Sequence, residues 1–335
     1  MEFSLEPSHL LARLDKVALS TDRGNGSKDP LKGEEAQRLR TFCTSNSVIP
    51  ARDLDQYGLA LMIGDLMLVK SDFSGRVARL ASATRSVEEA RAAAAKELFA
   101  LKWGPTRTPI YDLLIVGTVL VPSKRENQLK VAHWLVHDAK VPVNGRDLSG
   151  STAMNHAIST KPVFDPDFAE ILYEGGGDVN DRNRYGCTPA HEIIMIMDAR
   201  NSQAVRAPVG AMRWFLSHGG NLDIKDNEGM TARGTFTKTC AMHRSAGSFS
   251  INEVSKVVEQ DDRRRKQLGD RCCTFCGREP DGKVKLLACS RCKITKYCSL
   301  PRNCQKGDWP VHKVTCKTPE QLARAKTYLG IPIEG

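Results

Sequence analysis

Eight of the eleven cysteines in this 335-residue chain fall between residues 272 and 316. Two pairs among them have two residues between their cysteines, a spacing that lets both thiolates turn toward one metal ion. Cys272 breaks that spacing and is left out of the predicted ligand set. The predicted ligands are Cys273, Cys276, Cys289, Cys292, Cys298, Cys304, His312 and Cys316.

Eight such ligands fit two tetrahedral zinc sites and leave no coordination position for water. Closed sites of this kind are structural and not catalytic. A segment this short buries too little apolar surface to fold by itself. Zinc binding then supplies much of its folding free energy, on the order of 10 kcal/mol per ion. The sequence therefore predicts two structural Zn²⁺ ions.

Dense cysteines also occur in secreted disulfide-bonded domains, which need a signal peptide. The start of the chain, residues 1–7, has early acidic residues and no apolar core segment. The longest apolar stretch, residues 113–121, is nine residues long, against about 18 for a membrane-spanning helix. We therefore expect an intracellular protein of the nucleus or cytoplasm, without a membrane partner, whose clustered cysteines bind metal.

The run from Tyr297 to Cys316 resembles the MYND zinc finger, and the match extends over about 46 residues. The resemblance implies two interleaved sites. His312 and Cys316, four residues apart, would lie on one helix and bind the same ion. The chain departs from the family in placing five residues between Cys298 and Cys304, where three are usual. The implied ligand sets are Cys273, Cys276, Cys298 and Cys304 for the first ion, and Cys289, Cys292, His312 and Cys316 for the second.

The resemblance also implies a peptide site, because MYND fingers typically bind short proline-containing peptides. The surface that they use includes the Gln and Trp of a Cys-Gln-x3-Trp run, which here are Gln305 and Trp309. An aromatic wall suits an extended proline-rich strand. Trp309 has a second interpretation, as core packing between the short helix and the metal-bound loops. The two roles are compatible.

A motif recurs between residues 104 and 235. It starts at Thr152 as Thr-Ala-Met-Asn-His-Ala, returns at Thr188 as Thr-Pro-Ala-His-Glu-Ile and again, in part, at Thr231; a fainter start lies at Thr108. The pattern resembles the ankyrin repeat, which begins with Thr-Pro-Leu-His and has a period of about 33 residues. The spacings here are longer, at 44, 36 and 43 residues. We therefore expect three to four repeats with insertions.

Two insertions, residues 160–166 and 198–209, are expected to form loops between paired helices. Glycines at 175–177 and 219–220 are expected to end the second helix of a pair with positive φ. His156 and His191 invite a metal or catalytic interpretation, but their place in the repeat start favours hydrogen-bonding structural histidines.

The predicted fold class is mainly α: an ankyrin-type helical repeat stack, an N-terminal helical region and a small irregular double-zinc finger. In the N-terminal region we expect helices near 34–45, 52–69 and 86–102. Residues 234–248 are interpreted as a linker ahead of a charged helix. The expected organisation is 1–103 helical with a flexible loop near 20–33, 104–235 repeats, 236–270 linker and charged helix, 271–318 zinc finger and 319–335 tail.

The expected function is a non-enzymatic zinc-binding adaptor, because ankyrin stacks offer extended surfaces to protein partners. The combination is typical of transcriptional or signalling regulation. One alternative is a lysine methyltransferase, since some MYND fingers lie inside SET enzymes, yet only 19 residues follow Cys316 and no glycine-rich cofactor loop is found. The other is nucleic-acid binding, since the net charge is +10. The finger lacks the ligand spacing of DNA-reading fingers, so nucleic acid is an unlikely partner.

Overall fold

The computed structural model describes residues 32–42, 48–81, 86–159, 164–195, 202–245, 251–282, 284–299 and 304–321. The expected flexible loop therefore lies mostly outside the described residues, as does most of the C-terminal tail. The N-terminal helices are α2 (Gly33–Phe42), α3 (Pro50–Asp53), α4 (Gln56–Ile63), α5 (Leu66–Ala81) and α6 (Val87–Ala100).

The expected helix over residues 52–69 is wrong, because the chain forms three helices there. Asp55 caps α4, accepting a hydrogen bond from the amide of Gly58 at 2.7 Å. Gly64 ends α4 with a left-handed φ of 72°, a conformation that glycine adopts without a steric penalty. The cap at Asp55 and the left-handed glycine at 64 thus divide an apolar stretch whose helical periodicity is continuous.

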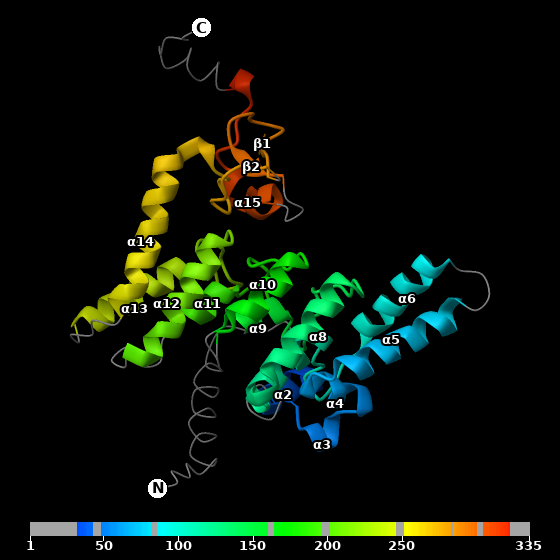
Figure 1. Cartoon of the computed structure of the whole chain (residues 1–335). Helices are drawn as coiled ribbons and strands as arrows, with labels where there is room; N and C mark the ends of the chain where they lie inside the picture. The colour runs from blue at the N-terminus through cyan, green and yellow to red at the C-terminus, as the bar shows by residue number, and fades with distance from the viewer. Residues whose placement is uncertain are drawn as a thin grey trace, which may run out of the picture.

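Four helix pairs follow, stacked side by side (Figure 1). The first helix of each pair contacts the first helix of the next pair. Among the second helices, α8 contacts α10 and α12 contacts α14. One continuous apolar core extends from the N-terminal helices through all four pairs. The pairs are α7 (Ile110–Leu120) with α8 (Arg125–His137), α9 (Ala153–Ile158) with α10 (Pro166–Glu174), α11 (Pro189–Ile193) with α12 (Ser202–Ser217), and α13 (Ala232–Ser245) with α14 (Ile251–Leu268).

Each of the last three pairs is preceded by the same tight turn. An Asp or Asn side chain accepts a hydrogen bond from the backbone amide four residues later, at 2.8–3.0 Å. Three residues after it stands a glycine with φ between 77° and 86°, which a side chain would strain. The turn residues are Asp147 with Gly150, Asn183 with Gly186, and Asp226 with Gly229.

The threonines of the repeated motif stand at the start of the first helices. The amide of Thr152 donates to Asn155 Oδ1 at 2.9 Å, and the amide of Thr188 donates to His191 Nδ1 at 3.1 Å. His191 Nδ1 is thus an acceptor, so Nε2 carries the hydrogen and points to the carbonyl of Met230 at 3.4 Å in the next repeat. His191 therefore links two repeats.

Two loop expectations are wrong. Residues 202–209 of the second expected insertion begin helix α12, whose buried face of Ala211, Met212 and Phe215 makes a long helix favourable. Residues 234–245 of the expected linker belong to α13. Phe236 and Cys240, four residues apart, are both buried and anchor it. Residues 160–163 of the first insertion lie outside the described residues.

After α14 and a 3-10 turn, η2 (Gly269–Arg271), the chain forms a small unit with its own buried cluster. Its strands β1 (Leu286–Ala288) and β2 (Lys296–Cys298) are antiparallel, with Leu287 opposite Tyr297, and helix α15 (Cys304–His312) follows. This unit lies beside α14, on the side of the stack that carries the turns (Figure 1). Among the described residues, no helix is long and apolar enough to cross a membrane.

Candidate metal centres and the cleft beside them

The structure gathers the first predicted ligand set around one point. Cys273, Cys276, Cys298 and Cys304 are buried, and their sulfur atoms all lie within 4.8 Å of one another. The Sγ atoms of Cys298 and Cys304 are 3.4 Å apart. The unusual five-residue spacing between these two cysteines therefore does not keep Cys304 from the cluster. Residues 300–303, within that spacing, lie outside the described part of the chain.

The second set converges in the same way. Cys289, Cys292, His312 and Cys316 are buried and offer ligand atoms within 4.8 Å of one another. Nε2 of His312 lies 3.5 Å from Sγ of Cys292, and its Nδ1 lies 3.5 Å from the hydroxyl of Thr295. Nε2 is thus the nitrogen that faces the sulfurs, and Thr295 orients the ring. An outer partner of this kind is usual for a metal-bound histidine.

The chemistry of the clusters fits zinc. Contacts with Cys276, Cys298 and Cys304 hold the pKa of Cys273 far below its usual range, while the contact with Cys273 raises the pKa of Cys276. Crowded thiols of this kind share negative charge, which a soft cation neutralises. Four Cys or His ligands in a closed group form a structural zinc site. The two four-ligand clusters fit two zinc ions.

The zinc-binding unit is docked on the repeat stack through the loop of the first cluster. A Cβ placed on Gly219, which follows α12, would lie 3.2 Å from Cβ of Cys276. Arg278 of the unit donates to the carbonyl of His218 at 3.3 Å. From α14, Arg265 donates to the carbonyl of Gly220 at 2.8 Å, and Arg264 to the carbonyl of Gly277 at 3.0 Å. The Arg-rich end of α14 thus connects the zinc-binding unit to the repeat stack.

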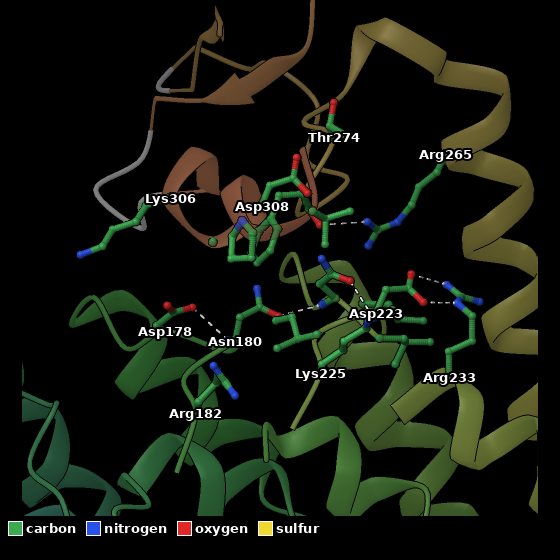
Figure 2. Close-up of a pocket in the computed structure, with 18 of the residues that line it drawn as sticks. Asp178, Asn180, Arg182, Asp223, Lys225, Arg233, Arg265, Thr274, Lys306 and Asp308 are labelled. Carbon is green, nitrogen blue, oxygen red and sulfur yellow. Dashed lines mark hydrogen bonds and ion pairs between the residues drawn. The ribbon is translucent and has the colours of Figure 1, made fainter. Parts of the chain in front are cut away.

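A cleft of about 790 Å³ lies between the docked unit and the stack (Figure 2). One wall comes from the turns of the last two repeats, including Asn180, Asp223 and Lys225, and from α14. The other comes from the zinc-binding unit, including Lys306 and Asp308 of α15. No sequence pattern predicts this cleft, because its shape depends on how the two units are docked.

Gln305 and Trp309, the predicted peptide-binding residues, lie one helical turn apart on α15. The side-chain amide of Gln305 donates to Sγ of Cys289 at 3.6 Å, so it supports the second metal cluster. Trp309 is 37% exposed, and its ring centre lies 6.1 Å from that of His312. Its neighbours Asp308 and Pro310 line the cleft, while Trp309 faces a different side of the helix.

Residues 273–316 match the family model of the MYND finger. This segment is a MYND finger. A relative, the SET domain and MYND-type zinc finger protein 6 of Schizosaccharomyces pombe, is 51% identical over 47 residues. Those residues are 14% of this chain and 9% of that protein. The similarity is confined to the MYND finger, so it gives no support to a methyltransferase domain in this chain.

The repeats have relatives as well. An ankyrin repeat protein of Rickettsia felis is 23% identical over 142 residues, 42% of this chain and 57% of that protein. The match to a solved ankyrin repeat protein covers 60% of this chain and 94% of the other chain, at 16% identity and a TM-score of 0.37. The ankyrin-type assignment therefore depends on the stacked helix pairs, their threonine starts and their turns.

Proposed function

We propose that the chain is a non-enzymatic protein–protein interaction adaptor of the cell interior, and that its ankyrin-type stack and MYND finger bind one extended protein segment together. The cleft of about 790 Å³ carries this proposal, because residues of both units line it. Two linked contact surfaces increase the avidity for one partner without any new kind of contact. We assign the zinc ions no catalytic role, since each has four protein ligands and no open position.

The finer proposal is that the partner segment contains proline and, beyond the cleft, continues around α15 to pack on Trp309. An exposed indole provides a flat apolar wall for an extended, proline-rich strand, and Trp309 is 37% exposed. Gln305 beside it would position the metal-bound loop and present its carbonyl oxygen to the peptide. A role in transcriptional or signalling regulation is part of this proposal and follows from the combination of modules.

The test begins with capture of partners from cell extract on the full-length, zinc-loaded chain. Arrays of proline-containing peptides from those partners then identify the bound segment. Trp309→Ala should weaken binding about tenfold or more, because buried tryptophans dominate binding energies at interfaces. The matched control is Val314→Ala, which removes an apolar side chain that is 78% exposed in the same finger. Equal affinities for both variants would remove Trp309 from the site.

A further inference from the structure

Three side chains with metal-ligand chemistry meet outside the MYND finger, where the first two repeats contact each other. Asp112, Asp147 and His156 offer carboxylate and imidazole atoms that all lie within 4.8 Å of one another. None of the three belongs to the cleft or to the zinc clusters. The repeat pattern predicts a structural role for His156, and neither aspartate belongs to a metal-binding sequence motif.

The repeat architecture builds this cluster. Asp112 stands four residues after Thr108, and His156 stands four residues after Thr152, so the two occupy the same position in consecutive repeats. Their helices, α7 and α9, contact each other. Asp147 comes from the tight turn before α9, where its Oδ1 accepts from Ser149 Oγ at 2.6 Å and from the amide of Ser151 at 2.9 Å. Its other oxygen, Oδ2, faces His156 Nε2 at 3.1 Å.

Asp112 is the unusual member of the cluster. It is 3% exposed, and neither carboxylate oxygen has a hydrogen-bond partner among the described residues. Burial raises the pKa of Asp112 to about 8. A buried carboxyl group without a hydrogen-bond partner is unfavourable. Lys102 lies close enough to interact electrostatically, but its Nζ donates to the carbonyl of Arg146 at 2.8 Å.

An imidazolium on His156 pairs with Asp147 and does not satisfy the carboxyl group of Asp112. Its Nε2 is directed to Asp147, and Asp112 is left without a donor. Two carboxylates and a neutral imidazole carry two negative charges, which one divalent cation balances. Imidazole nitrogen with carboxylate oxygen suits ions such as Zn²⁺, Co²⁺ or Mn²⁺. These ions bond such ligands at about 2.0–2.2 Å, a distance that small rotations of the two carboxylates bring within reach.

We propose that Asp112, Asp147 and His156 bind one divalent transition-metal ion, in a third metal site that braces the first two repeats. Asp112 and His156 Nε2 each lose a hydrogen to solvent when the ion binds, as metal coordination requires. Asp147 keeps its bonds to Ser149 and Ser151 through Oδ1 and uses Oδ2 for the ion. Three protein ligands leave a coordination position for water.

The later repeats provide controls within the same chain. In the third repeat the turn residue is Asn183, which forms the same backbone hydrogen bonds as Asp147. Asp147→Asn therefore preserves the turn. In the fourth repeat the turn residue is Asp226, and the position equivalent to His156 is Thr235. Asp226→Asn thus makes the same chemical change in a turn that has no histidine beside it.

The experiment is equilibrium dialysis of the full-length chain, with both finger sites loaded with Zn²⁺, against Co²⁺. Zinc binds more tightly than cobalt and stays in the finger. We expect the wild type to bind one Co²⁺ per chain. Asp112→Asn and Asp147→Asn should each bind Co²⁺ at least about tenfold more weakly. Asp226→Asn should bind as the wild type does. The bound ion should show cobalt d–d absorption without thiolate charge transfer.

Thermal unfolding checks the same variants, because a ligand that binds only the folded state raises its melting temperature. Added Co²⁺ should raise the melting temperature of the wild type and leave that of Asp112→Asn unchanged. Circular dichroism verifies that the isosteric variants keep the fold. Absence of bound Co²⁺ in the wild type up to about 1 mM, or equal binding by wild type and Asp112→Asn, would overturn the proposal. Thiolate charge transfer would place the ion in the finger and also overturn it.

Discussion

Gly219, which follows α12, lies against Cys276 of the first zinc cluster, so closely that a Cβ on Gly219 would stand 3.2 Å from Cβ of Cys276. Gly219 has a φ of 85°. Gly176 occupies the equivalent place after α10, with a φ of 90°, and a Cβ there would meet nothing within 4 Å. The two glycines thus share a backbone conformation and differ in their contact with the MYND finger.

This pair predicts how docking contributes to stability. Gly219→Ala and Gly176→Ala should each cost about 1–2 kcal/mol for placing a side chain in the left-handed region. Gly219→Ala should cost more, because its methyl group also pushes against Cys276. Urea unfolding measures both variants, and limited proteolysis should show a more exposed finger only in Gly219→Ala. Equal losses and equal protease resistance would mean that the finger is not docked there.

The sequence was sufficient to predict the two zinc clusters, because ligand type and spacing are local features. All eight predicted ligands fall into the two groups that the resemblance implied. The docking of the finger was not predictable in the same way. It depends on contacts such as that of Arg265 with Gly220, 45 residues apart, for which the sequence has no pattern.

The sequence was sufficient to predict where the repeats start, but not that the fourth repeat continues into helix α13. Thr231 marked the fourth repeat, but Gly234 in the first turn of α13 suggested a linker. Glycine is destabilising mainly in a helix interior, and near the start the Thr231 hydroxyl accepts from the Gly234 amide at 3.0 Å. Burial of Phe236 then outweighs the local preference.

Loss of one ligand should empty one zinc site. Cys316→Ser should reduce the bound zinc from two ions to one and should unfold the finger, because structural zinc contributes on the order of 10 kcal/mol. Metal analysis and protease sensitivity beyond residue 270 measure these effects. Cys272→Ser is the control: its buried thiol lies 3.6 Å from the carbonyl of Gly269 and outside both clusters. A Cys316→Ser chain that keeps two zinc ions would contradict the ligand assignment.

The ion pairs between α5 and α6 predict a pH dependence. Glu97 accepts from Arg79 at 2.6 Å and from Arg76 at 3.2 Å, and the hydrogen bond from Arg79 lowers its pKa below the ordinary 4.5. Because folding lowers the pKa of Glu97, its ion pairs stabilise the fold at pH values above the pKa of the unfolded state. This stabilisation disappears as the pH falls through the pKa of the folded state.

Glu97→Gln should therefore cost about 0.2–1 kcal/mol at neutral pH, the range measured for exposed ion pairs. The difference from the wild type should shrink as the pH falls below 4.5. Denaturant unfolding across this range measures it, with Glu88→Gln on the exposed first turn of α6 as the control. A difference that does not change with pH would assign the effect to packing.

We propose above that the repeat stack and the MYND finger bind one partner segment between them. Lys225 lines the cleft from a repeat turn and Lys306 lines it from α15 (Figure 2). The most direct measurement is the affinity of a captured partner for Lys225→Glu and Lys306→Glu in the full-length, zinc-loaded chain. Both reversals should change the affinity for the same partner segment, because both alter the charge that this segment meets. A partner whose affinity changes with one reversal and not with the other would bind a single unit and contradict the shared cleft.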